Sequence, residues 1–187
     1  MDISLHFLII KLMIIRRVTE RDLSAVMKIE KASFIPAIQE TESVFAERIR
    51  VCGNCFIIFE DEATHNAAGY FSAERRAAVP KDDGDFSLNH SASRTYAADG
   101  PVIYLSSFAV LPQYRGKGTG RSLFSDSMEW FAEHNPGLTT AVLLVNETWK
   151  NALHIYTQYG FRETRRIRGF FPDGERAADG IVMEKKL

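Results

Sequence analysis

The sequence feature that most constrains the fold is the stretch LSSFAVLPQYRGKGTGRSLF, residues 105–124. It begins inside the apolar run 102–110, which is typical of a buried β-strand, and then crosses Pro112. Three glycines and three cations share the next segment, 115–121, and an amphipathic helix begins near Gly118. The chain must therefore fold a strand, a tight turn and a helix in direct succession.

This turn has the features of an anion-binding site. The first N–H groups of a helix lack intrahelical partners and carry partial positive charge, and glycines let a bulky anion approach them closely. The spacing matches neither the triphosphate loop GxxxxGK[ST] nor the dinucleotide fingerprint GxGxxG. We predict a pyrophosphate site formed by Arg115, Gly116, Lys117, Gly118, Thr119, Gly120 and Arg121.

Strand and helix signals alternate along the rest of the chain. Strands are predicted over 14–18, 55–59, 67–74, 102–110, 139–145, 161–168 and 181–185. Helices are predicted from a near capping box at Thr19 and Asp22 to about Phe34, and over about 41–50, 118–134 and 151–159. This order predicts one mixed α/β domain built on a single sheet, without internal repeats.

Composition limits the possible classes. The 187 residues suit one domain, and 45% hydrophobic with 25% charged residues is typical of a folded globular protein. A formal net charge of −1 argues against nucleic acid as a partner. Two cysteines, Cys52 and Cys55, are too few for a disulfide scaffold. We interpret them as a turn that leads into a strand, although a redox pair or half of a metal site fits the same spacing.

Two segments carry less information. Residues 1–12 are apolar, but Lys11 interrupts them and they are too short to span a membrane. We interpret them as an N-terminal extension to a domain at 13–187 and expect no membrane association; an extra strand or a homodimer contact fits them as well. Residues 80–101 are polar and long for a loop, so they form either a lid over a binding site or a disordered insertion. Their acidic cluster attracts a cationic amine or is ordinary solvated surface: Asp82, Asp83 and Asp85.

Two motifs together resemble the GNAT superfamily of N-acetyltransferases. FAVLPQYRGKGTGRSLF matches the signature segment of that family, with its acetyl-CoA motif R-x-x-G-x-G at 115–120, and YTQYGF at 156–161 matches a second landmark. The resemblance extends from about Met13 to the C-terminus. It implies a central, mostly antiparallel sheet with splayed central strands and helices on both faces. It also implies a cytoplasmic enzyme that takes acetyl-CoA as cosubstrate and needs no metal.

The resemblance further implies residue roles. Main-chain groups of the strand 102–110, which we call the signature strand, would bind the pantetheine arm, and one N–H would hold the thioester oxygen. A primary amine would attack the thioester directly, and Tyr156 would protonate the leaving thiolate. The alternatives are a packing role for Tyr156 and a catalytically silent acyl-CoA-binding module. Beyond the glycine turn, the residues implied for cofactor binding are Phe108, Ala109, Val110 and Asn151.

The chain departs from the family pattern next to the second landmark. Many relatives have an asparagine where Trp149 stands. Either Asn146 or Asn151 would take its place, or Trp149 would stack on the cofactor.

A second departure concerns the general base. Many relatives carry a glutamate on the signature strand, whose polar side chains here are those of Tyr104, Ser106 and Ser107. A water chain or a carboxylate such as Glu40 or Glu42 would then accept the proton of the amine. A weak base favours acceptors of low pKa, near ~7.8 for an α-amine rather than ~10.4 for lysine, because more of the amine is already neutral.

Two subclasses compete for the acceptor. The tail 166–187, with an aromatic pair before Asp-Gly-Glu, resembles protein N-terminal acetyltransferases, including the ribosomal-protein type. The segment 30–49, with its aromatic-proline turn, resembles arylalkylamine and polyamine acetyltransferases. The acceptor is therefore a small-molecule amine or a peptide α-amine. In either case its site would be lined by the 80–101 segment together with Phe34, Pro36 and Ser106.

Overall fold

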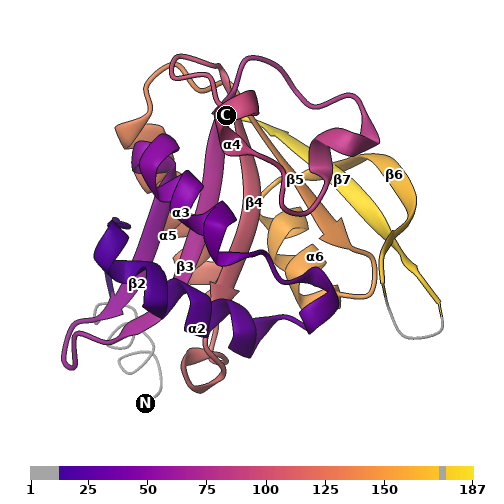
Figure 1. The fold of residues 1–187 in the computed structure, drawn as a ribbon. Coiled ribbons are helices and arrows are strands. Elements are labelled where there is room, and N and C mark those ends of the chain that lie inside the picture. Colours follow the sequence, from indigo (N-terminus) through magenta and orange to yellow (C-terminus); the bar gives the residue numbers. More distant parts are fainter. Residues whose placement is uncertain (1–12, 173–175) are drawn as a thin grey trace.

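One seven-stranded sheet forms the centre of the protein (Figure 1). The computed structural model describes residues 13–172 and 176–187. The strands lie in the order β1-β2-β3-β4-β5-β7-β6, and every neighbouring pair is antiparallel except β4 and β5, which are parallel. The prediction of a mixed α/β fold on a single, mostly antiparallel sheet is confirmed.

The elements follow the sequence signals closely. The strands are β1 Met13–Arg17, β2 Phe56–Asp61, β3 Ala67–Arg76, β4 Val102–Val110, β5 Thr140–Asn146, β6 Arg162–Phe171 and β7 Ala178–Lys186. The helices are α2 Leu23–Ser33, α3 Glu42–Val51, α4 Ala92–Thr95, α5 Thr119–His134 and α6 Lys150–Gln158. The last two strands are longer than predicted because their ladder continues toward the hairpin end, where Phe171 pairs with Ala178. The predicted extension, residues 1–12, and the Asp-Gly-Glu segment, residues 173–175, lie outside the described residues.

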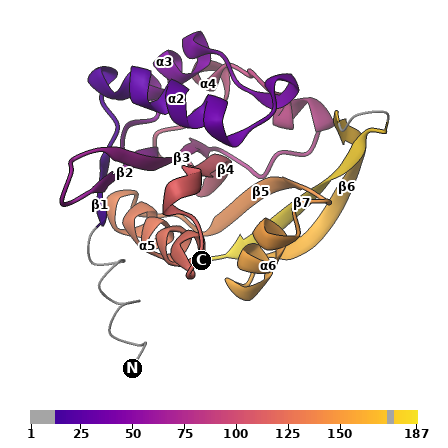
Figure 2. The same ribbon diagram turned by 90° about the horizontal axis from the view of Figure 1, so that it is seen from below.

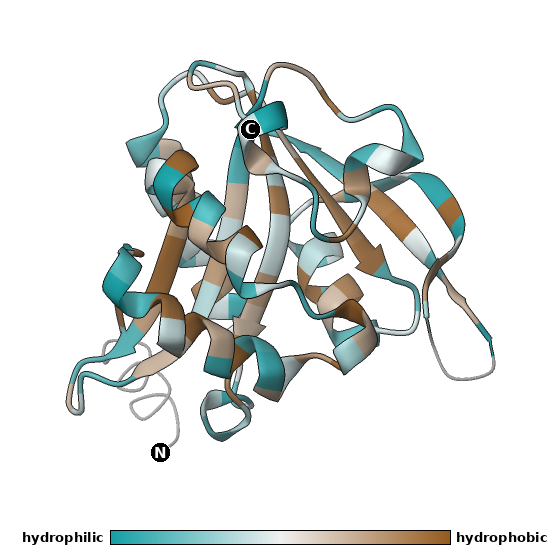
Figure 3. Ribbon diagram, in the orientation of Figure 1, coloured by the Kyte–Doolittle hydropathy of each residue, from teal (hydrophilic) through white to brown (hydrophobic). Residues whose placement is uncertain are grey.

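Helices cover both faces of the sheet (Figure 2). Figure 2 shows α2, α3 and α4 on one face and α5 and α6 on the other. Each layer buries an apolar stripe: Val26, Ile29, Phe45 and Ile49 on the first face, and Leu123, Phe124, Met128 and Phe131 on the second. Strand β2 lies between these layers and is hydrophobic over most of its length (Figure 3). Within the described residues, no helix combines the length and the apolar character that crossing a bilayer requires.

The two central strands separate partway along their length. Parallel pairing of β4 with β5 begins at Val102 opposite Thr140 and ends at Leu105 opposite Leu143. Strand β4 nevertheless continues to Val110, and β5 continues to Asn146. An irregularity in the β3–β4 register, where Ser106 has no partner, lies at the same point. The predicted splay of the central strands is therefore present, and it opens toward the glycine turn that follows β4.

The segment 80–101 is ordered rather than a plain loop. It contains a short 3₁₀ turn, Asp83–Phe86, and the single-turn helix α4. Phe86 and Ala92 are buried, and Phe86 packs edge-on against Tyr104 of β4. The 3₁₀ turn and α4 are each only four residues long, so the polar composition of the segment hid them from sequence reasoning.

The cysteine pair forms the predicted turn into a strand. A 3₁₀ turn, Gly53–Cys55, joins α3 to β2, and both thiols are buried. The Cys55 thiol donates a hydrogen bond to the Asn135 side-chain oxygen at 3.2 Å. Burial raises the pKa of both thiols, that of Cys55 to about 12, so both remain protonated and unreactive near neutral pH.

Candidate functional site

A cavity of about 1030 Å³ occupies the gap between β4 and β5. Its walls come from both layers: Phe71, Phe124 and Tyr156 belong to the α5–α6 side, whereas Glu30 and Phe34 belong to the α2–α3 side. The cavity therefore passes through the sheet where the strands separate. Its volume is slightly above the usual range for ligand pockets, about 300–1,000 Å³.

Main-chain groups of β4 face this gap. The Leu111 N–H donates to the Ala68 carbonyl at 2.8 Å, so Leu111 and, by strand alternation, Ala109 direct their main-chain groups toward β3. The N–H and C=O groups of Phe108 and Val110 consequently point toward the gap. A ligand with amide groups could complete the ladder there, as a peptide does at an open sheet edge.

The glycine turn presents unpaired N–H groups at the mouth of α5. Gly116, Lys117 and Gly118 all have positive φ, at 91°, 50° and 84°, which turns successive main-chain N–H groups outward. A Cβ atom on Gly116 or Gly118 would meet no atom within 4 Å, so the space beside the turn is open. The N–H groups of Arg115, Thr119 and Ser122 have main-chain acceptors. Within the described chain, those without one are the N–H groups of Gly116, Lys117, Gly118, Gly120 and Arg121.

The side chains of this turn differ in what they do. The buried Thr119 hydroxyl donates to the Gly116 carbonyl at 2.9 Å and so fixes the turn. Arg115 donates to the Val110 carbonyl at 2.6 Å and to the Ser33 hydroxyl at 3.2 Å, which ties the turn to β4 and α2. Arg121 is exposed and lines the cavity, so its guanidinium can reach an anion held by the turn.

Helix α6 brings Tyr156 and Asn151 to the cavity. Asn151 lies in the first turn of α6, is exposed and lines the cavity. The Tyr156 ring lies 5.0 Å from the Phe124 ring, and no hydrogen bond joins its hydroxyl to a described residue. Burial raises the pKa of the Tyr156 hydroxyl, which keeps it protonated at neutral pH.

Trp149, which stands where many relatives have an asparagine, packs between two other aromatic rings. Trp149 stands between Phe34 and Phe171, with ring centroids 5.9 Å and 5.5 Å apart. It thus forms part of an aromatic wall on the α2 side of the cavity. The side-chain oxygen of Asn146 accepts hydrogen bonds from the Thr148 N–H and hydroxyl, so it closes the turn before α6.

Of the predicted acceptor residues, Phe34 lies in this aromatic wall, together with Phe86 and Leu88 of the 80–101 segment. The apolar residues that line it are Phe34, Ile35, Ile38, Phe86, Leu88, Leu144, Trp149, Phe170 and Phe171. Pro36 opens the short turn Pro36–Ile38 that places Ile38 there. Ser106 lines the cavity too, but its hydroxyl donates to the Ser72 carbonyl at 2.9 Å.

Two carboxylates lie beside the aromatic wall. Glu40 lines the cavity, yet both of its oxygens bind the buried guanidinium of Arg48, one of them at 2.7 Å. Glu42 is exposed in the first turn of α3 and does not line the cavity. Glu30 of α2 does line the cavity, and sequence reasoning missed it. The feature of the sequence that could have revealed Glu30 is its position next to Ile29, at the end of the apolar stripe of α2.

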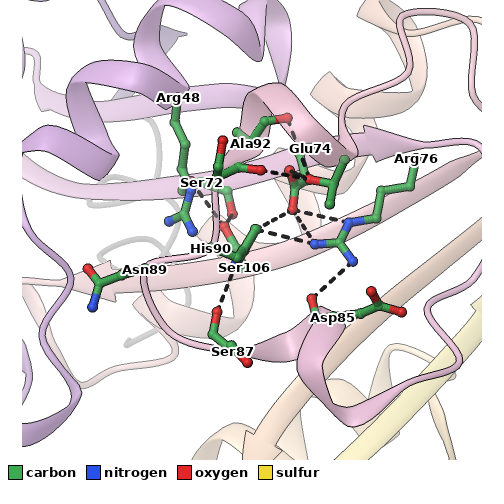
Figure 4. Close-up of polar contacts among 12 residues, drawn as sticks. Arg48, Ser72, Glu74, Arg76, Asp85, Ser87, Asn89, His90, Ala92 and Ser106 are labelled. Carbon is green, nitrogen blue, oxygen red and sulfur yellow. Dashed lines mark hydrogen bonds and ion pairs between the residues drawn. The ribbon is translucent and has the colours of Figure 1, made fainter.

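Glutamates hold the 80–101 segment against the sheet and α3. Glu74 of β3 contacts the His90 ring at 2.6 Å and accepts the Thr95 hydroxyl at 2.9 Å (Figure 4). Glu40 accepts the Asn89 N–H at 3.3 Å. The acidic cluster of the segment does not line the cavity: Asp83 pairs with Arg165, and the Asp85 carbonyl accepts from Arg76. The segment therefore contributes Phe86 and Leu88 to the cavity, and not its carboxylates.

The described residues contain no group of three or more His, Cys, Asp or Glu side chains placed to hold a metal ion. The cavity itself offers main-chain donors, hydroxyls, aromatic rings and two carboxylates. These groups can bind an anion and an amine and can move protons between them.

Comparisons with known proteins bear on the fold and the family. A family model described as Acetyltransferase (GNAT) family matches residues 23–161. An N-alpha-acetyltransferase of Sulfurisphaera tokodaii is 30% identical over 128 residues, which are 65% of this chain and 73% of that protein. Two solved structures share the fold. They are the ribosomal-protein-S18-alanine N-acetyltransferase of Escherichia coli (TM-score 0.68, 21% identity, 93% of each chain) and Arabidopsis thaliana NAA60 in complex with acetyl-CoA (TM-score 0.69, 18% identity, 94% of this chain and 98% of that one).

The contacts that anchor the 80–101 segment to α3 predict that thermal stability depends on pH through Glu47. Hydrogen bonds from Ser93 and Ser91 lower the pKa of Glu47 from its usual 4.5 to about 2. Because the folded-state pKa is the lower one, the stabilisation is complete above pH 4.5 and is lost as the pH falls toward 2. We expect Glu47→Gln to lower the melting temperature at pH 6 and the difference from wild type to vanish near pH 2.

Thermal unfolding followed by circular dichroism across this pH range measures the difference. The exposed Glu42→Gln, on the same helix, is the control and should show no such convergence. A difference in melting temperature between Glu47→Gln and wild type that stays constant from pH 6 to pH 2 would contradict the stabilising role of the Glu47 carboxylate.

Proposed function

The chain belongs to the acetyltransferase (GNAT) family, and on that premise we propose that it moves an acetyl group from acetyl-CoA to a primary amine within one ternary complex. The family makes the chain an acyltransferase. The observation that carries the proposal is the open gap between β4 and β5, which leads directly into a turn of unpaired N–H groups. Pantetheine amides fit the first feature, and a diphosphate fits the second.

The proposed chemistry assigns roles to groups around the gap. Both main-chain groups of Phe108 and the N–H of Val110 bind the pantetheine arm, and one of these N–H groups holds the thioester oxygen as negative charge develops on it. The unpaired N–H groups of the turn, those of Gly116, Lys117, Gly118, Gly120 and Arg121, bind the diphosphate. Tyr156, still protonated at neutral pH, donates its proton to the leaving sulfur.

The acceptor we propose is the α-amine of a peptide whose first side chain is large and apolar. The aromatic wall around Trp149 supports an apolar side chain, because burying a Phe or Met against it contributes about 1.5–3 kcal/mol. The Sulfurisphaera relative is named an N-alpha-acetyltransferase, which supports an α-amine. An α-amine of pKa ~7.8 is also partly neutral at pH 7.

A panel of acceptors tests the proposed function. Purified protein is mixed with acetyl-CoA and with peptides that begin with Met, Phe or Ala, with an arylalkylamine and with a polyamine, and thiol release is followed. We expect kcat/KM for Met or Phe to exceed that for Ala by about tenfold or more. Preference for the polyamine would overturn the acceptor class, and no turnover with any amine would support a silent acyl-CoA-binding module instead.

The diphosphate site makes a second prediction. Arg121→Ala removes an exposed cation beside the turn and should weaken acetyl-CoA binding about tenfold in calorimetry, since hydrogen bonds to charged groups contribute about 1.5–3 kcal/mol. The affinity for S-acetylpantetheine, which lacks the diphosphate, should not change. Arg50→Ala, at the exposed end of α3, is the control cation. Equal losses for both ligands would place the diphosphate elsewhere.

The general acid makes a third prediction. Tyr156→Phe keeps the ring contact with Phe124 and removes only the hydroxyl, so kcat should fall by about a hundredfold while the acetyl-CoA Kd is unchanged. Tyr159→Phe is a matched control at the C-cap of the same helix, because Tyr159 packs against Phe124 and Lys185 and does not line the cavity. Unchanged kcat in Tyr156→Phe would leave this residue a packing role alone.

A further inference from the structure

We propose that Glu30, reached through Ser107 and Tyr70, takes the proton that the ammonium group of the acceptor must lose before its nitrogen can attack. This inference rests on the proposed function. The signature strand carries no acid, so the base has to come from another element. Of the two carboxylates that line the cavity, Glu40 is already neutralised by Arg48, whereas Glu30 has no cationic partner among the described residues.

Three side chains form a continuous row from the cavity to Glu30. The Tyr70 hydroxyl lies 2.8 Å from the Ser107 hydroxyl and in hydrogen-bond contact with a Glu30 oxygen. Tyr70 of β3 and Glu30 of α2 are almost fully buried, while Ser107 of β4 is half-buried and lines the cavity. Three separate elements thus meet on the α2–α3 side of the gap, next to the strand that holds the thioester.

The number of hydrogens fixes the direction of this row. An ionised carboxylate only accepts hydrogen bonds, so the Tyr70 hydroxyl must donate its single hydrogen to Glu30. The Tyr70 oxygen can then only accept from Ser107. The lone pairs of the Ser107 oxygen are left to accept an N–H from the cavity. Every donor in the row therefore points from the cavity toward Glu30, as a proton relay requires.

The second oxygen of Glu30 is held as well. It accepts the Glu40 N–H at 2.8 Å, and the charged groups that face Glu30 are the Glu40 carboxylate and the Arg48 guanidinium paired with it. Burial raises the pKa of Glu30, while the hydrogen bonds from Tyr70 and Glu40 oppose that effect. A carboxyl group of raised pKa is a stronger base, which brings it closer to the pKa of an ammonium group.

The protons balance as follows. One ammonium proton moves to Ser107 as the Ser107 proton moves to Tyr70 and the Tyr70 proton moves to Glu30, which later releases it to solvent. The neutral nitrogen attacks the thioester carbon, the C–N bond forms and the C–S bond breaks. Tyr156 gives its proton to sulfur, and a second proton from the nitrogen then replaces the proton that Tyr156 has lost. The products are the amide, coenzyme A and one proton.

The pH dependence of turnover tests the inference. With Glu30 present, the ammonium form is a substrate, so kcat/KM should be flat between the pKa of Glu30 and that of the amine. In Glu30→Gln only the free amine can react, so kcat/KM should rise tenfold per pH unit below the amine pKa. At pH 7 we expect a loss of about a hundredfold for a lysine-like amine and a much smaller loss for an amine of low pKa.

Two further variants keep the test decisive. Tyr70→Phe retains the buried ring and breaks the relay, so it should show the same sloping profile even if Glu30→Gln unfolds. Glu42→Gln removes an exposed carboxylate of α3 and should leave the profile flat. Melting temperature and the acetyl-CoA Kd are measured for each variant, because a purely structural role changes these and not the shape of the profile.

The outcomes separate this inference from the proposed function. A wild-type protein without turnover on any amine overturns both. Active wild type together with a flat profile in Glu30→Gln and Tyr70→Phe overturns the relay alone. A sloping profile in both variants, with acetyl-CoA affinity retained, supports the relay.

Discussion

The separation of β4 from β5 is the constraint on which the rest of the structure depends. Main-chain N–H and C=O groups inside a protein need partners, yet pairing stops at Leu105 and Leu143 while both strands continue. The Val110 carbonyl is satisfied by the Arg115 side chain, but both main-chain groups of Phe108 and the N–H of Val110 are left for a ligand or water to satisfy. Each separated strand then leads to one half of the site, because β4 runs into the glycine turn and β5 runs into α6. The gap, the anion cradle and Tyr156 are thus consequences of one break in the ladder.

Local signals explain why much of this was predictable. The strand 102–110, the glycine turn and α5 lie next to one another in sequence, and each has its own composition and period. The aromatic wall was beyond such reasoning, since Phe34, Trp149 and Phe171 come from three distant segments. Trp149 itself was expected at the cofactor or in place of an asparagine. Its position against Phe34 depends on how α2, α6 and the last hairpin approach each other, and no short sequence pattern encodes that.

The polar stripe on β3 shows a second limit. Tyr70, Ser72 and Glu74 share one face of β3, because side chains two residues apart along a strand point the same way. In the structure α2, α3 and the 80–101 segment cover this face, and Tyr70 and Glu74 are buried with hydrogen-bond partners. The partners are Glu30 and His90, which sequence reasoning had left without a role. Buried polar networks depend on long-range pairing, so they are the part of a site that a sequence reveals last.

The distribution of reactive groups also favours direct transfer over an acetylated enzyme. A covalent route needs an activated nucleophile in the cavity. Cys52 and Cys55 are buried outside it, and burial raises the pKa of both thiols. Of the three serines that line the cavity, Ser33 accepts from Arg115, Ser106 donates to a carbonyl and Ser107 donates to Tyr70. None of them has a hydrogen bond to a histidine among the described residues. In the proposed reaction the nucleophile enters with the acceptor, so the gap would hold both reactants at once, and its passage through the sheet allows the two to enter from different faces.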